Sequence, residues 1–114
     1  MKAAVGCDHA GFVLKRAVLD FLKEKGIEVQ DFGTFSEERV DYPDFALEVA
    51  RAVSLGDADC GVLLCGTGIG MAVAANKVSG VRAAACNDVE SARMARAHND
   101  LNVITLGGRF IKPD

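Results

Sequence analysis

The chain has 114 residues, half of them apolar and a quarter charged, which is the balance of an ordinary globular domain. At ~100–200 residues per domain, this length predicts one domain over residues 1–114. Thirteen basic and 16 acidic residues give a net charge of −3, and no basic stretch indicates nucleic acid or an anionic membrane as a partner. The apolar runs are too short to span a bilayer, and residues 3–5 are too short an apolar start for a signal peptide. We therefore expect a soluble cytoplasmic protein whose four cysteines are reduced thiols.

The first half of the chain alternates short apolar runs with helical periodicity. Residues 2–7 form a brief apolar run, which predicts a strand. From Leu14, apolar residues recur at three- and four-residue spacing, which predicts an amphipathic helix that Gly26 stops. A second strand is predicted over 27–32. Pro43 favours the start of another helix, which ends at Gly56, because its missing N–H costs nothing in a first turn.

The second half continues the alternation. Residues 60–65 are a continuous apolar run, typical of a strand that is buried on both faces. A glycine-rich turn follows this strand, and Asn87 followed by Glu90 resembles a capping box. The predicted elements after the turn are a helix, a strand, a helix and a strand, over 71–77, 81–86, 87 to about 98, and 102–106.

Strand–helix alternation of this kind predicts an α/β fold in which a five-stranded parallel sheet carries helices on both faces. In such sheets, ligands bind outside the carboxyl ends of the strands. Polar and reactive residues fall at three of the predicted strand ends, namely Asp8 with His9, Cys65, and Arg109. The sequence therefore predicts a binding or catalytic site at this edge of the sheet.

The segment Cys-Gly-Thr-Gly-Ile-Gly at 65–70 is the strongest local signal. Alternating glycines between a strand and a helix leave backbone N–H groups free to point at an anion beside the helix N-terminus. The segment lacks the lysine of a Walker loop and the spacing of a dinucleotide fingerprint. On spacing alone, an anion-binding loop and a purely steric strand-to-helix turn are equally supported.

Cys65 favours the functional interpretation of this loop. A thiol between a buried strand and a helix N-terminus lies where the thiolate form is favoured. Cys60 and Cys86 are more simply interpreted as buried cysteines that act as small hydrophobes. A metal site joining Cys7, Cys65 and Cys86 with His9 matches no standard zinc spacing, so we predict neither a metal nor another cofactor.

The remaining candidate residues each have a plain structural alternative. His98 is predicted to end a helix, where capping the helix is the competing role. Arg109 follows two glycines and either binds an anion or is a solvated loop charge. Asp41 and Tyr42 precede Pro43 and either line a site or simply begin a helix.

Five motifs, in order along the chain, carry a resemblance to a known family. They are Gly-Cys-Asp-His-Ala-Gly at 6–11, Asp-Tyr-Pro at 41–43, the 65–70 loop, Ala-Asn-Lys at 75–77 and His-Asn-Asp at 98–100. Together they resemble the family of type B ribose-5-phosphate isomerases and galactose-6-phosphate isomerase subunits, over essentially the whole chain. The resemblance implies a Rossmann-like three-layer fold and a homodimer, or a dimer of dimers, with sites at the subunit boundary. It also implies metal-free, cofactor-free isomerisation of a sugar phosphate.

The resemblance implies three catalytic roles. Cys65 matches the cysteine that moves a proton between C1 and C2 of the sugar. His98 matches a ring-opening histidine that reaches the site from the partner subunit, with Asn99 beside it. The groups that match the donors to the enediolate oxygens are Thr67 and the backbone N–H groups from Gly66 to Gly70, namely those of Gly66, Thr67, Gly68, Ile69 and Gly70.

The resemblance implies roles in substrate binding as well. Asp8 matches a residue that contacts the ring oxygens of the sugar. His9 and Arg109 match phosphate contacts, and Asp41 and Tyr42 match the wall on the substrate side. All of these residues are expected around one sugar-phosphate pocket.

The sequence departs from the family at its end. Family members continue past the position of Pro113 into a final helix and a basic tail whose arginines help to hold the phosphate, whereas this sequence stops at Asp114. We therefore expect a fold that lacks the family's C-terminal helix, either as a truncated form or with a depleted phosphate site. Weak sugar-phosphate binding and slow turnover are the expected consequences.

The expected activity is interconversion of ribose 5-phosphate and ribulose 5-phosphate. One alternative is isomerisation of a 6-phosphohexose, allose or galactose 6-phosphate, because a pocket discriminates one carbon unit only modestly. Another alternative is a non-catalytic module that binds sugar phosphate. Covalent hydrolysis through Cys65 is disfavoured because no third residue is evident that would orient a base.

Overall fold

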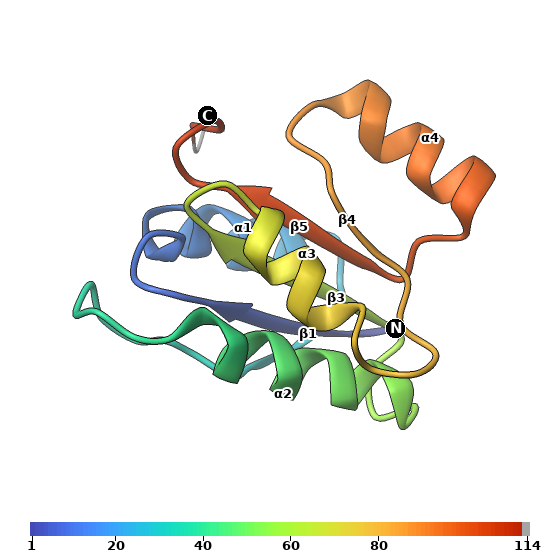
Figure 1. The fold of residues 1–114 in the computed structure, drawn as a ribbon, viewed down its shortest axis with the longest axis horizontal. Coiled ribbons are helices and arrows are strands. Elements are labelled where there is room, and N and C mark those ends of the chain that lie inside the picture. Colours follow the sequence, from blue (N-terminus) through green and yellow to red (C-terminus); the bar gives the residue numbers. More distant parts are fainter. Residues whose placement is uncertain (113–114) are drawn as a thin grey trace.

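The computed structural model describes residues 1–112 as a sheet with flanking helices (Figure 1). The strands are β1 (Lys2–Cys7), β2 (Glu28–Asp31), β3 (Cys60–Cys65), β4 (Ala83–Ala85) and β5 (Val103–Gly107). The helices are α1 (Phe12–Glu24), α2 (Tyr42–Ser54), α3 (Ile69–Ala75) and α4 (Val89–Asn99). The order and type of these elements confirm the prediction, with small differences at the ends. Pro113 and Asp114, where the expected departure from the family falls, lie outside the described residues.

All five strands are parallel and lie in the order β2-β1-β3-β5-β4. Every strand therefore begins at the same edge of the sheet and ends at the opposite edge. The carboxyl ends of β1, β3 and β5 lie side by side in the middle of the sheet. The predicted parallel α/β sheet is confirmed, and its centre brings together the three strand ends that carry polar and reactive residues.

The two faces of the sheet carry separate cores, because successive strand side chains point to opposite sides. On one face, Leu63 of β3 and Val103 of β5 pack with the apolar sides of α2 and α3. On the other face, Val62 and Leu64 pack with Leu14 of α1. Helices on both faces of the sheet are thus confirmed. Within residues 1–112, no helix has both the length and the apolar character to cross a membrane.

Helix α4 differs from the other three helices because none of its residues is buried. Figure 1 shows it in orange, set off from the rest of the chain. The predicted capping box from Asn87 to Glu90 is wrong. The cap is Asp88, which has extended backbone geometry and whose Oδ1 accepts the N–H of Ser91 at 2.7 Å. Asn87 is thereby left one residue outside the helix, where its side chain makes other contacts.

Candidate active site

A pocket of about 240 Å³ lies at the carboxyl edge of the sheet, where the sequence predicts a site. It is formed by the ends of β1, β3 and β5, the start of α2 and the loop that leads into α3. Its lining residues are Asp8, His9, Ala10, Tyr42, Cys65, Gly66, Thr67, Gly70 and Arg109. The fold therefore brings most of the predicted site residues into one cavity.

The loop after β3 directs two of its backbone donors at its own side chains and leaves others without a protein acceptor among residues 1–112. Gly68 has a φ of 84°, a left-handed conformation that favours glycine. Its N–H donates to Sγ of Cys65 at 3.0 Å, and the N–H of Ile69 donates to Oγ1 of Thr67 at 3.1 Å. The N–H groups of Gly66, Thr67 and Gly70 donate to no protein acceptor among residues 1–112. Two of the expected loop donors are thus engaged internally, and three are left for a ligand.

Close packing explains one glycine in this loop and one beside it. A Cβ at Gly70 would lie 2.9 Å from the ring of Tyr42, which begins α2 and leans against the start of α3. A Cβ at Gly107, at the end of β5, would lie 2.6 Å from the backbone carbonyl of Thr67. Since side chains at these positions would displace the loop or the tyrosine, both glycines serve the shape of the pocket.

Two side chains that are not among the predicted site residues also hold this loop in place. Nδ2 of Asn87 donates to the carbonyl oxygen of Thr67 at 3.1 Å, and its Oδ1 accepts the N–H of Gly107 at 2.8 Å. Oγ1 of Thr105, which is fully buried, donates to the carbonyl oxygen of Gly68 at 2.6 Å. The sequence offers one signal for each: Thr105 is a polar residue in an apolar strand, and Asn87 follows the end of β4 at the site edge.

The other three cysteines differ from Cys65 in their surroundings. Burial raises the pKa of the fully enclosed Cys7 thiol from 9.0 to about 11, against the opposing effect of nearby Lys15. Desolvation also raises the pKa of Cys60 and of Cys86. Only Cys65 both lines the pocket and accepts an N–H donor at its sulfur. The other three thiols are therefore held in the neutral form at neutral pH.

Asp8 and His9 follow β1 and line the pocket from its other side. Oδ1 of Asp8 accepts the N–H groups of Ala10 and Gly11, both at 2.9 Å, so one oxygen of this carboxylate organises the turn into α1. Oδ2 accepts no hydrogen bond from the described residues. Nδ1 of His9 accepts the N–H of Val40 at 3.2 Å, so the neutral imidazole carries its proton on Nε2. Each side chain thus uses one polar atom in a hydrogen bond within the protein and leaves the other available for a ligand.

Arg109 reaches the pocket from the turn that follows β5. Its backbone N–H donates to the carbonyl oxygen of Gly66 at 2.9 Å, and its Nε lies 3.2 Å from where a Cβ of Gly66 would stand. The side chain is exposed, so its charge is available at the mouth of the pocket. Asp41, the residue before α2, is exposed and does not line the pocket.

His98 and Asn99 are not brought to the pocket by this chain. They end α4, which leads into the amino end of β5, whereas Cys65 pairs with Gly107 at the carboxyl end. The two ends of β5 are about 13 Å apart at ~3.3 Å per residue. Both residues are exposed. Within one chain, therefore, His98 lies at the opposite edge of the sheet from the thiol.

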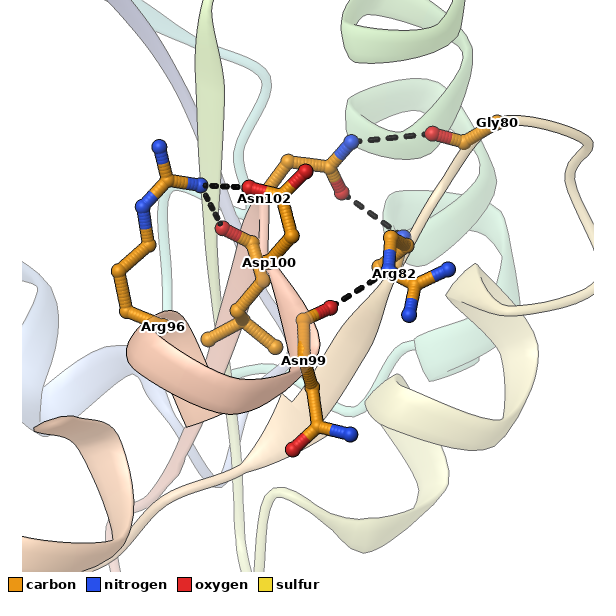
Figure 2. Close-up of polar contacts among 7 residues, drawn as sticks. Gly80, Arg82, Arg96, Asn99, Asp100 and Asn102 are labelled. Atoms are coloured by element: carbon orange, nitrogen blue, oxygen red, sulfur yellow. Dashed lines mark hydrogen bonds and ion pairs between the residues drawn. The ribbon is translucent and has the colours of Figure 1, made fainter. Parts of the chain in front are cut away.

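A polar cluster holds the end of α4 that carries His98 and Asn99 (Figure 2). Asp100 ends the helix with a φ of 52°, and Nη1 of Arg96 donates to its Oδ1 at 2.9 Å. Nε of Arg82 donates to the carbonyl oxygen of Asn99 at 2.6 Å, and Asn102 accepts the backbone N–H of Arg82 at 2.8 Å. The helix end is thus fixed to the strands although no residue of α4 is buried.

The chemistry at the carboxyl edge defines a class of protein. One thiol, a hydroxyl and several unengaged N–H groups surround a small cavity, with an imidazole and a guanidinium at its margin. Among residues 1–112, no three His, Cys, Asp or Glu side chains are grouped as a metal site would require. The arrangement suits a small anionic ligand on a parallel α/β fold.

Comparisons with known proteins identify the family. Residues 3–114 match the sequence profile of the Ribose/Galactose Isomerase family. Ribose-5-phosphate isomerase B of Escherichia coli is 51% identical over 110 residues, which cover 96% of this chain and 74% of that protein. The structure of ribose-5-phosphate isomerase B from Clostridium thermocellum superposes with a TM-score of 0.95 at 55% identity, covering 97% of this chain and 75% of that one.

A further solved structure carries a ligand. It is ribose-5-phosphate isomerase B from Mycoplasma genitalium with bound ribulose-5-phosphate. It superposes with a TM-score of 0.91 at 41% identity, and the match covers 98% of this chain and 75% of that one. The chain belongs to the ribose/galactose isomerase family, and it resembles the type B ribose-5-phosphate isomerases in it. It spans about three quarters of the length of these relatives. The resemblance inferred from the five motifs is therefore confirmed.

Proposed function

We propose that this protein is an aldose–ketose isomerase that interconverts ribose 5-phosphate and ribulose 5-phosphate. The observation that carries the proposal is the setting of Cys65. Cys65 lines the pocket, its sulfur accepts the Gly68 N–H, and Thr67 and unengaged backbone donors flank it. The bound ribulose-5-phosphate in the Mycoplasma genitalium relative supports the choice of substrate class.

In the proposed reaction, the Cys65 thiolate removes the proton from C2 of the open-chain aldose. The electrons pass to the C1 carbonyl, giving an enediolate, and the hydroxyl proton on the C2 oxygen moves to the C1 oxygen. The same sulfur then returns its proton to C1, which gives the ketose and regenerates the thiolate. An N–H donor at the sulfur stabilises the thiolate that begins the cycle. The acid–base work thus needs one group that both takes and returns a proton.

Negative charge develops on the C1 and C2 oxygens as the enediolate forms. The hydroxyl of Thr67 accepts the Ile69 N–H, so its own proton is free to donate. Together with the N–H groups of Gly66, Thr67 and Gly70, it supplies donors that are already oriented before the reaction begins, and such preorganisation stabilises developing charge. The proposal therefore assigns charge stabilisation to protein donors and invokes no metal.

The substrate is held by the margins of the pocket in this proposal. Arg109 and Nε2–H of His9 would donate to the phosphate, and such charge-assisted hydrogen bonds are among the stronger ones. Oδ2 of Asp8 would accept from sugar hydroxyls. Tyr42 forms one wall of the pocket, and Asp41 directly precedes it in the chain.

Ring opening requires an acid–base group besides Cys65, and in this proposal His9 is assigned to the phosphate. We propose that His98, with Asn99, enters the pocket of a second copy in a homodimer. Support comes from their exposed position at the far edge of the sheet and from the polar cluster that fixes them there. In a two-fold dimer each partner would supply one histidine to the other.

The experiment that tests the proposed function is direct. The protein is incubated with ribose 5-phosphate, and ribulose 5-phosphate is measured over time, with galactose 6-phosphate and allose 6-phosphate assayed in parallel. Conversion of the pentose supports the proposal, whereas preferential conversion of a hexose would assign the other substrate class. Binding of all three sugars without conversion of any would instead indicate a non-catalytic module.

A further inference from the structure

We infer that Asn87 and Thr105 are positioning residues for the catalytic loop, residues 65–70. Each donates to the carbonyl oxygen of one peptide group and so orients the N–H at the other end of that group. The inference rests on the proposed function, since it assigns how Cys65 and Thr67 are oriented for that reaction. Neither residue lines the pocket. Both contact the loop through backbone carbonyl oxygens, those of Thr67 and Gly68.

The peptide group between Thr67 and Gly68 carries the argument for Asn87. In a trans peptide the C=O and the N–H point in opposite directions, so fixing one fixes the other. The carbonyl oxygen of Thr67 accepts from Nδ2 of Asn87 at 3.1 Å, and the N–H of Gly68 donates to Sγ of Cys65 at 3.0 Å. Asn87 therefore aims the only N–H that the described residues direct at the sulfur.

The next peptide group repeats the arrangement with Thr105. The carbonyl oxygen of Gly68 accepts from Oγ1 of Thr105 at 2.6 Å, and the N–H of Ile69 donates to Oγ1 of Thr67 at 3.1 Å. Because Oγ1 of Thr67 is occupied as an acceptor, its hydroxyl proton is turned away toward a ligand. The backbone N–H of Ala72 also donates to the carbonyl oxygen of Gly68, at 3.1 Å. Thr105 and the first turn of α3 thus together set the direction of the hydroxyl that would donate to the enediolate.

The two side chains are anchored independently of the loop. Oδ1 of Asn87 accepts the N–H of Gly107 at 2.8 Å, which continues the β5 edge beyond the end of β4. Thr105 is fully buried within β5 itself. The sheet therefore fixes the positions of the loop donors, although the loop is rich in glycine and has little stiffness of its own.

The test combines substitutions with a chemical readout on the thiol. Asn87→Ala removes both bonds, and Asn87→Asp retains the acceptor for Gly107 but loses the donor to Thr67. The matched control is Asn76→Ala, because Asn76 makes a similar two-way clamp, donating to the carbonyl of Ala83 and accepting its N–H, both at 2.8 Å. Thr105→Val removes the hydroxyl, and Thr105→Ser restores it.

Two measurements are made on each variant. The first is the rate at which iodoacetamide alkylates Cys65, followed across pH by mass spectrometry of the Cys65 peptide. The second is kcat and KM for ribose 5-phosphate. Both Asn87 variants are expected to slow alkylation at neutral pH and to lower kcat by about tenfold or more, the effect of one hydrogen bond to a charged group. KM is expected to change little.

Thr105→Val is expected to lower kcat by about tenfold, while Thr105→Ser behaves as the wild type. Wild-type kcat and alkylation in both Asn87→Ala and Thr105→Val would overturn the inference, and so would an equal loss in Asn76→Ala. A change in Asn87→Asp without one in Asn87→Ala would assign the effect to the new charge and would also overturn it. If the wild type does not isomerise the sugar, the proposed function fails, but the alkylation rates still decide the role of Asn87.

Discussion

Gly107→Ala tests how closely the catalytic loop must be placed. The new Cβ would lie 2.6 Å from the carbonyl carbon and oxygen of Thr67, whereas ordinary contact begins at 3.4 Å, so loop and strand must separate by about 0.8 Å. The carbonyl of Thr67 is held by Asn87 and cannot rotate away freely. A displacement near 1 Å at reacting groups costs about 100-fold in rate, and overpacking costs about 1–3 kcal/mol of stability. We therefore expect kcat for ribose 5-phosphate to fall by about 100-fold.

Gly26→Ala is the matched control for this substitution. Gly26 has a φ of 72° and nothing within 4 Å of its missing Cβ, so alanine there costs about 1 kcal/mol of backbone strain without a clash. Urea unfolding should show that both variants lose stability, and kinetics should show that only Gly107→Ala loses kcat. If Gly107→Ala turned over substrate like Gly26→Ala, the claim that loop position limits the reaction would be refuted.

Three further predictions concern other parts of the molecule. His98→Asn should slow turnover of a substrate that must open from its ring far more than turnover of an open-chain substrate. Mixing the His98→Asn protein with the Cys65→Ala protein should restore up to about a quarter of wild-type activity if each site is shared by two copies. No recovery of activity on mixing would contradict a shared site. Lys15→Ala should lower the free energy of unfolding by about 3 kcal/mol in urea titrations, because Nζ of this buried lysine pairs with Asp31 at 2.8 Å; an unchanged midpoint would refute that role. Because the pKa of Cys7 rises from 9.0 to about 11 on folding, the unfolded chain loses this proton first, and stability should fall as pH rises between these values; Cys7→Ala should flatten that decline.

The fold could be predicted from the sequence because its signals are local and agree with one another. The apolar run at 60–65 is β3 to the residue, and the stripe from Leu14 belongs to α1. Parallel pairing follows from strand–helix alternation alone. The differences lie where a signal was shared by neighbours, as at Asn87 and Asp88, both of which are residue types that cap helices.

The site could be predicted only in part, because its supporting contacts are between distant segments. Cys65, with its loop, could be predicted from the order of residues along one strand and turn. The contact of Asn87 with the Thr67 carbonyl spans 20 residues and depends on how far β4 runs beside β5. The place of His98 at the far edge follows from the direction of α4, which local periodicity alone does not relate to Cys65.

Cys65 is proposed to move the proton in a sugar-phosphate isomerisation. The measurement that tests it most directly is deuterium incorporation from D₂O during turnover of ribose 5-phosphate, followed by NMR at C1 of ribulose 5-phosphate and at C2 of the recovered aldose. The wild type, Cys60→Ala and Cys86→Ala should incorporate deuterium, and Cys65→Ala should bind the sugar but incorporate none. Continued deuterium incorporation by Cys65→Ala would contradict the account and assign the proton transfer to another group.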